Sequence, residues 1–192
     1  QPSPELRPGL GTTWGERRQS RITTSPFQRA EATTPFATAT LHYNDLEGAR
    51  AMAGGQGMFP QRSVDLAGGV LSVALRDGDS GRFLGGFESA GRDYMIGEAG
   101  QRYVIVVKNR ASTRLEVVVS VDGLDVIDGR PAAFNKRGYL VDGNGTLEID
   151  GFRQSQDAVA AFRFGSVRGA YVTKKTGDSR NVGAIGIAAF HE

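Results

Sequence analysis

Cysteine is absent from this chain of 192 residues, and histidine occurs only twice. Without cysteine the protein has no disulfides, no thiolate nucleophile and no cysteine-ligated metal site. A three-histidine zinc site is impossible, and a serine-histidine-aspartate triad would have to use His42 or His191. His42 falls on the polar side of a predicted strand, and His191 is the penultimate residue. The composition therefore argues against an enzyme, and we expect neither a cofactor nor a catalytic residue.

Long apolar runs are also missing. The longest weakly polar run, residues 182–190, contains two glycines and is far shorter than the ~20 residues that a membrane-spanning helix needs. The formal net charge is only +2, and residues 1–40, with five arginines and three glutamates, account for all of it. A neutral body offers no field that would concentrate nucleic acid. We therefore expect neither membrane insertion nor a nucleic-acid partner.

Glycine, by contrast, is abundant: 27 residues, about twice its usual share of ~7%. From residue 64 to residue 190, short apolar runs alternate with glycines and with Asp-Gly pairs such as Asp122-Gly123. Such pairs favour tight turns, because their backbones accept positive φ. Short strands at this spacing, without a long helix, predict an all-β fold, most simply a jelly-roll-like β-sandwich.

The predicted strands show alternating polarity or runs of β-branched residues. They cover residues 36–43, 70–76, 82–87, 102–108, 114–121, 138–141, 146–150, 158–164, 170–173 and 182–190. A short helical turn is predicted over residues 45–53, because glycines follow it directly.

Residues 1–35 differ from the β-sandwich domain predicted over residues 36–192. They hold five of the seven prolines, at positions 2, 4, 8, 26 and 35. Proline removes a backbone donor and biases its predecessor towards extended conformations, so we expect an extended, irregular N-terminal arm. A purely disordered segment rarely carries groups such as Trp14, Ile22 and Phe27. The arm is therefore either a mobile tail or a segment that docks, on its own body or on a second copy.

The first functional hypothesis is a non-enzymatic structural or assembly protein, such as a filament or surface-layer subunit. A β-body with free edges accepts an extended segment from a neighbour, and repeated head-to-tail donation makes a ring or a filament. The arm or residues 36–43 would be donated, which makes a homo-oligomer the expected partner. The candidate self-association residues are Trp14, Ile22, Phe27, Phe36 and Leu41.

The alternative hypothesis is a β-sandwich module that binds a carbohydrate or another surface ligand. Sandwich folds host many such modules, and an exposed aromatic side chain offers a face on which a sugar ring can stack. The aromatic residues considered for this role are Trp14, Phe134, Tyr139 and Phe152. This hypothesis predicts a monomer that retains glycans, whereas the first predicts oligomers that depend on the arm.

A calcium loop is the only metal site that the sequence suggests. Asp142 and Asn144 alternate with glycines, as oxygen ligands do in calcium loops, and Glu148 follows nearby. The rest of a twelve-residue loop, with a bidentate glutamate at its last position, is absent. Ordinary turn chemistry explains the same residues equally well.

Residues 90–190 resemble a poorly characterised family of exported bacterial all-β proteins. The resemblance is carried mainly by LEVVVSVDGLDVIDGRP at residues 115–131 and GDSRNVG at residues 177–183. It implies an all-β body and export, but no activity, cofactor or catalytic residue. The opening Gln1-Pro2-Ser3-Pro4 also resembles a mature N-terminus after signal-peptide removal, although a chain trimmed at its N-terminus for expression would look the same. We therefore expect a secreted, cell-surface or periplasmic bacterial protein.

Overall fold

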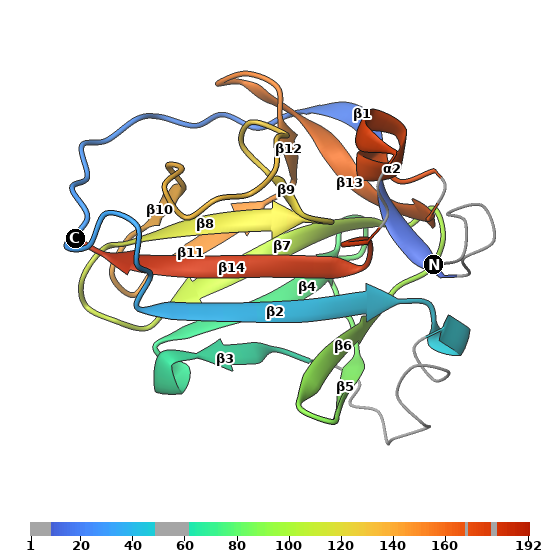
Figure 1. Ribbon diagram of the computed structural model, residues 1–192, viewed down its shortest axis with the longest axis horizontal. Helices are drawn as coiled ribbons and strands as arrows, with labels where there is room; N and C mark the ends of the chain where they lie inside the picture. Colours follow the sequence, from blue (N-terminus) through green and yellow to red (C-terminus); the bar gives the residue numbers. More distant parts are fainter. Residues whose placement is uncertain (1–8, 49–61, 168, 178–179) are drawn as a thin grey trace.

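The computed structural model describes residues 9–48, 62–167, 169–177 and 180–192. Its regular structure is almost entirely β, arranged in two sheets that pack against each other (Figure 1). This confirms the predicted all-β sandwich. Within the described part of the chain, no helix combines the length and the apolar character needed to cross a membrane.

The first sheet, called sheet A, follows the order β1-β13-β7-β4-β3, with β11 paired to β7 and β12 to β13. All of these pairs are antiparallel. The strands of sheet A are β1 (Leu10–Gln19), β3 (Val64–Leu66), β4 (Leu71–Asp77), β7 (Arg102–Asn109), β11 (Thr146–Ile149), β12 (Gly151–Arg153) and β13 (Ala158–Ser166).

The second sheet, called sheet B, follows the order β10-β8-β14-β2-β6-β5, with β9 paired to β8. One pair, β2 with β6, is parallel, unlike the antiparallel pairs expected of a jelly roll. The strands of sheet B are β2 (Ala37–Asn44), β5 (Gly86–Ser89), β6 (Arg92–Ile96), β8 (Leu115–Val121), β9 (Leu124–Asp125), β10 (Tyr139–Val141) and β14 (Ala184–His191).

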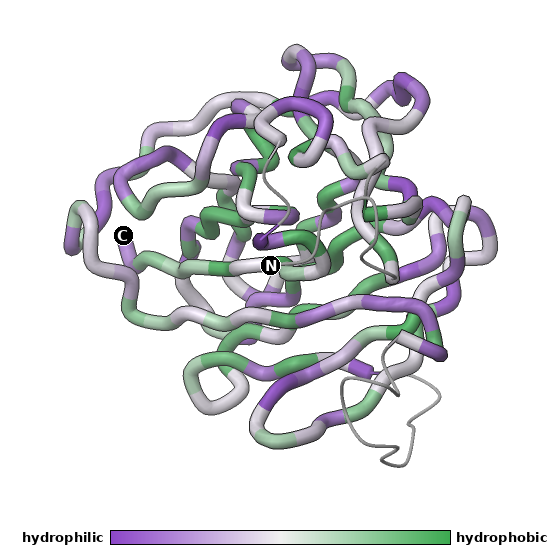
Figure 2. The backbone as a smooth tube through the Cα atoms, turned by 45° about the vertical axis from the view of Figure 1, so that its right-hand side comes forward, coloured by the Kyte–Doolittle hydropathy of each residue, from purple (hydrophilic) through white to green (hydrophobic). Residues whose placement is uncertain are grey.

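The hydrophobic core lies between the two sheets. Alternate residues of the central strands point into it, because successive side chains of a strand face opposite sides. The core receives Ile105 and Val107 from β7, and Val117 and Val119 from β8, all essentially inaccessible to solvent. Figure 2 shows the same division along the backbone, with hydrophobic stretches in the interior and hydrophilic ones in the outer loops.

The largest difference from prediction concerns the N-terminal arm. Residues 10–19, expected to be irregular, form β1, which pairs with β13 from Leu10↔Ser166 to Gln19↔Ala158. The arm's prolines all lie outside this stretch, so nothing in β1 prevents a ladder. Residues 20–36, called the strap below, contain no regular strand. The strap runs along the edge of the sandwich to the C-terminus, and the chain then returns as β2 (Figure 1).

A second difference concerns residues 170–173, which were predicted to be a strand. They begin the short helix α2 (Tyr171–Thr176), whose end is set by Gly177 in a left-handed conformation at φ 73°. The basic residues Lys174 and Lys175 in the last turn complement the negative end of the helix dipole. Of the helical turn predicted over residues 45–53, residues 46–48 are helical, and residues 49–53 lie outside the described part of the chain. A single 3-10 turn, Ala67–Gly69, connects β3 to β4.

Candidate functional site

The arm begins with a buried polar network that fastens β1 to both sheets. The hydroxyls of Tyr43 in β2 and Tyr103 in β7 both contact the Thr12 hydroxyl, at 2.8 and 2.6 Å. The Asp122 carboxylate accepts hydrogen bonds from the Thr12 N–H at 3.0 Å and from the Tyr43 hydroxyl at 2.5 Å. Thr12 is fully buried, and burial raises the pKa of both tyrosines well above the usual value. This network holds β1 in register, because a residue without a hydroxyl at position 12 would leave the buried hydroxyls of Tyr43 and Tyr103 without this partner.

The middle of β1 rests on an aromatic cluster. The ring of Trp14 stacks on Phe152 with centroids 5.7 Å apart and lies 4.5 Å from the ring of Tyr171. Trp14 remains 41% exposed, so the cluster covers one side of the indole only. The predicted anchor Trp14 therefore docks on its own chain, and as the only tryptophan it reports directly on the state of the arm.

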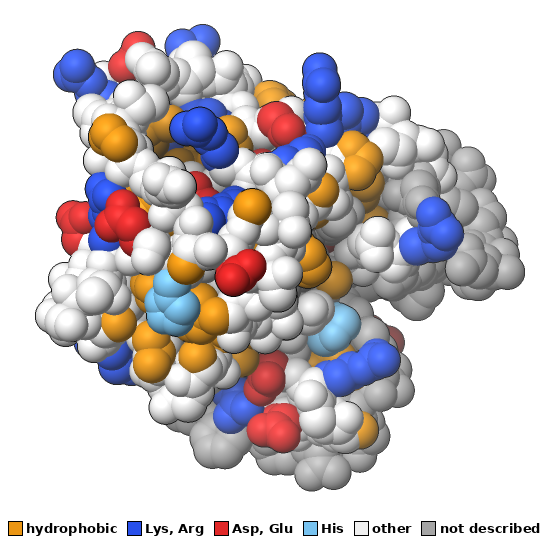
Figure 3. All heavy atoms as spheres, turned by 60° about the vertical axis from the view of Figure 1, so that its left-hand side comes forward, with side chains coloured by type: hydrophobic (Ala, Val, Ile, Leu, Met, Phe, Trp, Pro, Cys, Tyr) orange, Lys and Arg blue, Asp and Glu red, His pale blue; other side chains and the backbone are white. Residues whose placement is uncertain are grey.

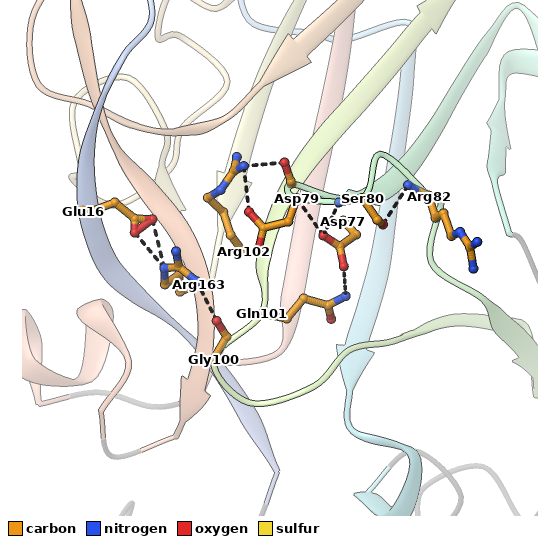
Figure 4. A network of polar contacts seen from close by, with 10 residues as sticks. Glu16, Asp77, Asp79, Ser80, Arg82, Gly100, Gln101, Arg102 and Arg163 are labelled. Carbon is orange, nitrogen blue, oxygen red and sulfur yellow. Dashed lines mark hydrogen bonds and ion pairs between the residues drawn. The ribbon is translucent and has the colours of Figure 1, made fainter.

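An ion pair adds to the attachment of β1 on β13 (Figure 4). The Glu16 carboxylate accepts from Arg163 Nε at 2.7 Å, while Arg163 Nη1 donates to the Gly100 carbonyl at 2.8 Å. The hydrogen bond from Arg163 lowers the pKa of Glu16. Because both side chains are substantially exposed, the pair adds at most ~1 kcal/mol of stability. Its main effect is to orient β1 on β13.

Arg29 is the principal anchor of the strap, and no sequence pattern predicted this role. Its Nε forms an ion pair with Glu116, and the two side chains are only 11% and 7% exposed. The other guanidinium nitrogens donate to the carbonyls of Phe134 and Lys136. The guanidinium also lies 3.6 Å from the ring centroid of Phe190. An arginine in a proline-containing segment is expected to be a solvated cation. Apart from the Ala32 carbonyl, three residues on, the partners of Arg29 are 87 or more residues away.

Arg114 holds the preceding part of the strap. It donates to the Ser25 hydroxyl at 2.9 Å and to the Pro26 carbonyl at 2.7 Å, and it lies 5.3 Å from the ring centroid of Phe27. Ile22 is attached by its backbone, which donates to the Gln156 carbonyl at 2.9 Å. The predicted anchors Ile22 and Phe27 are both half-buried, so the strap docks on the body through them as well.

Of the two remaining predicted self-association residues, Phe36 is the last residue of the strap and Leu41 lies in β2. Phe36 stacks on His191 with ring centroids 3.7 Å apart. Leu41 is 1% exposed and lies in the core, so it cannot contact a second copy while the sandwich is intact. The five predicted residues thus lie along the chain from β1 to β2 and do not form one surface patch.

A hollow of about 860 Å³ remains between the strap and the body. Strap residues Ile22 and Phe27 line one side, and Arg114, Tyr139 and Leu147 are among the residues that line the other. The strap therefore does not fill all of the space between itself and the body.

On the face drawn in Figure 3, acidic and basic side chains are interspersed with hydrophobic ones, in keeping with the small net charge.

The outer face of sheet B carries a second hollow, called the sheet B groove, of about 470 Å³. Its floor is formed by β2, β14 and β8, where Gly186 pairs with Thr40 on one side and with Ser120 on the other. Ala133 and Phe134, from the loop before β10, form its wall. The Phe134 side chain is 51% exposed, and Arg29 holds its carbonyl.

The outer face of sheet A has a comparable groove of about 420 Å³ with different chemistry. It also has an exposed ring, Phe83, which is 38% exposed. However, Arg62 and Lys108 line it together with Ser72 and Thr146. Cationic side chains therefore line the sheet A groove, whereas no described residue that lines the sheet B groove is charged.

The four aromatic residues predicted as candidates for stacking against a sugar differ in exposure and in their contacts. Phe152 is 1% exposed and is thus excluded. Trp14 is occupied on one face by its cluster, and the Tyr139 hydroxyl accepts from Arg153 Nε at 3.1 Å beneath the strap. Phe134 is the most exposed of the large hydrophobic residues in the described part of the chain.

The calcium candidates do not form a ligand set. Asp142 and Asn144 lie in the turn before β11, where the Gly145 N–H donates to the Asp142 carbonyl at 2.9 Å. Glu148 lies on β11 and forms an ion pair with Arg76 at 2.6 Å, which lowers the pKa of Glu148. Among the described residues, no three acidic or histidine side chains are grouped so that they could hold a metal ion.

The chain matches no family model, no curated protein and no solved structure. The resemblance to exported bacterial all-β proteins stays a prediction.

Proposed function

We propose that this protein is a non-enzymatic, extracytoplasmic structural subunit that self-associates by exchanging its N-terminal arm, β1 plus the strap, between copies. One observation carries the proposal. The strong contacts of the arm are made with partners that lie later in the chain, as in Thr12 with Tyr43 and Arg29 with Glu116. A second copy presents the same partners in the same places.

The end of the strap supplies the hinge that an exchange requires. The Ala30 N–H donates to the His191 carbonyl and the Phe36 N–H donates to the Ala189 carbonyl, both at 2.9 Å. Between them, residues 31–34 are exposed. A change of backbone direction here would break few contacts. Because an exchanged arm regains every contact, the balance between monomer and oligomer depends mainly on protein concentration and hinge strain.

Simple strand addition at the free edge of β1 is less favourable than exchange. Glu16, Arg17 and Arg18 are exposed there, and the pairing with β13 shifts register between Trp14 and Arg17. Charged side chains and bulges are devices that protect edge strands from pairing with other chains. The arm is therefore better suited to replacing its equivalent than to extending the sheet. Repeated head-to-tail replacement closes into a ring or grows into a filament.

A disulfide lock tests this proposal. Gln19 and Ala158 are direct partners in the β1–β13 ladder, which places their Cα atoms ~4.5–5.5 Å apart, within the range of a disulfide. The chain has no other cysteine, so Gln19→Cys with Ala158→Cys can form only one bridge per arm. Oxidation of dilute monomer locks the arm on its own body.

We expect the reduced double variant to form oligomers as its concentration rises, measured by light scattering, and the oxidised protein to stay monomeric. The matched control, Gln19→Ser with Ala158→Ser, should associate like the reduced protein under both conditions. If all three proteins remain monomeric at the highest soluble concentration, the proposal is wrong. The same holds if the locked protein oligomerises as readily as the reduced one.

A further inference from the structure

The floor of the sheet B groove is a regular grid set by the strand register. Gly186 of β14 lies between Thr40 of β2 and Ser120 of β8, and the next row places Ala188 between Thr38 and Val118. Neighbouring strands are ~4.8 Å apart. Two hydroxyl-bearing residues therefore stand roughly 10 Å apart on either side of a glycine that has no side chain. This leaves a bare strip of floor bordered by hydroxyls.

These hydroxyls are available to a ligand. Within the described part of the chain, no hydrogen bond is formed by the side chains of Thr38, Thr40 or Ser120, although all three line the groove. The remaining lining side chains are alanine, valine, isoleucine and phenylalanine, so none of the described lining residues is charged. A ligand that matches this surface is neutral, offers hydroxyls or other hydrogen-bonding groups, and has an apolar face.

The wall of the groove presents an exposed aromatic ring on an anchored stretch of backbone. Phe134 is 51% exposed, yet its carbonyl accepts a hydrogen bond from Arg29, and Arg29 is itself held by Glu116. The backbone beside the ring is thus anchored, while the ring faces solvent. An aromatic ring next to a few polar groups is a common composition of a small-molecule site.

Other occupants fit this surface less well. A peptide that adds a strand needs a free sheet edge, whereas β8, β14 and β2 all have strands on both sides. An anionic ligand would find no cation among the described lining residues. A wholly apolar ligand would cover the hydroxyls of Thr40 and Ser120 and leave them without partners, which costs free energy.

We propose that the sheet B groove binds a neutral pyranose oligosaccharide. One ring lies over Gly186, its hydroxyls bond to Thr40 and Ser120, and the CH face of a ring packs against Phe134. This site does not depend on arm exchange. The floor is made by central strands of sheet B, and an arm from either copy brings the same Arg29 to the Phe134 carbonyl. It would let an assembled subunit hold a glycan of a surface or matrix.

Amide chemical shifts of the ¹⁵N-labelled protein provide the test. The probes are maltotetraose, cellotetraose, mannotetraose and chitotetraose, each titrated into the intact chain. We expect saturable shifts with at least one of them, at a dissociation constant of about 1 mM or tighter. The shifts should be centred on Thr40, Ser120 and Gly186.

Two variants and one control variant test whether the oligosaccharide binds in the sheet B groove. Phe134→Ala should weaken binding about tenfold or more, since it removes the stacking face. Gly186→Ala should abolish binding, because the added Cβ occupies the floor, 2.8 Å from the Ser120 hydroxyl. Phe83→Ala, which removes the exposed ring of the other groove, should bind like the parent. Thermal unfolding confirms that each variant is folded.

The proposal is overturned if none of the four sugars gives saturable shifts. It is equally overturned if Phe134→Ala binds as tightly as the parent chain, or if the shifts map to the sheet A groove.

Discussion

Replacing Arg29 with alanine should destabilise this protein more than any other single change in the strap. Arg29 and Glu116 form an ion pair in which the two side chains are only 11% and 7% exposed. Removing the guanidinium leaves a carboxylate that is buried and has lost its ion-pair partner. Breaking a buried pair in this way costs ~3–5 kcal/mol, a large part of the ~5–15 kcal/mol by which a native domain is stable.

The assay is urea unfolding, followed by circular dichroism and by the fluorescence of Trp14, which lies in the arm itself. The matched control is Arg21→Ala, since Arg21 is an exposed arginine of the same strap, and its loss should change stability by less than ~0.5 kcal/mol. The double variant Arg29→Met with Glu116→Leu should recover most of the lost stability, because it removes both buried charges together. If Arg29→Ala costs no more than Arg21→Ala, the strap is not fastened as described.

Three further predictions concern the arm and the sheets. Trp14→Ala should cost ~2 kcal/mol in urea unfolding, less than a fully buried tryptophan, because 41% of the residue is exposed; no loss would mean that the aromatic cluster does not hold β1. Burial raises the pKa of Tyr43 and Tyr103 in the folded protein. The stability that these neutral tyrosines contribute is therefore fully present below their unfolded pKa of ~10, and it is lost as pH rises from there through their folded pKa values. The slope should reach ~1.4 kcal/mol per pH unit for each tyrosine, and Tyr43→Phe should reduce it in urea midpoints measured at alkaline pH. Gly138→Ala should cost ~2–3 kcal/mol, because the new Cβ would clash with the Val117 carbonyl oxygen.

Each of these predictions has an outcome that contradicts it. An alkaline slope that Tyr43→Phe leaves unchanged would mean that this hydroxyl is not protected from ionisation. For the glycine, the control is Gly91→Ala: Gly91 has φ 76° but no atom within 4 Å of the added Cβ, so only the left-handed strain of ~1–2 kcal/mol applies. Equal losses for Gly138→Ala and Gly91→Ala would show that the close approach to β8 is absent.

Local patterns were sufficient for most of the sandwich. The runs of β-branched residues in β7 and β8 and the Asp-Gly turn at Asp122-Gly123 identified central strands to within a residue or two. Local patterns gave the wrong secondary structure where contacts with other segments of the chain determine it. Val172 and Thr173 favour a strand locally, yet α2 forms there and its Tyr171 packs on Trp14.

The arm shows the same limit more clearly. The prolines before and after β1 led to the prediction of an irregular segment, although Thr12, Thr13 and Trp14 are good strand formers. The ladder becomes visible only with β13, more than 130 residues later. The aromatic anchors of the arm were predictable by residue type, but the contacts of Arg29 were not, since its partners come from distant segments.

The sheet B groove was partly visible in the sequence. Phe134 could be selected as an aromatic residue without a strand to bury it. The row of Thr40, Gly186 and Ser120 could not, because it exists only through the register of three strands. Sites of this kind depend on how distant strands pair, so they cannot be predicted from residue spacing along the chain.

Mixing two isotopic forms of the Gln19→Cys, Ala158→Cys variant tests the central claim, arm exchange, most directly. Unlabelled and ¹⁵N-labelled proteins would be mixed under reducing conditions at high concentration, oxidised, and separated by mass without reduction. Arm exchange predicts covalent dimers or longer chains of mixed isotopic mass, since Gln19 of one copy then pairs with Ala158 of another. If oxidation yields only monomers, each of a single isotopic form and each with its own internal bridge, the arm stays on its own body and the account of assembly is contradicted.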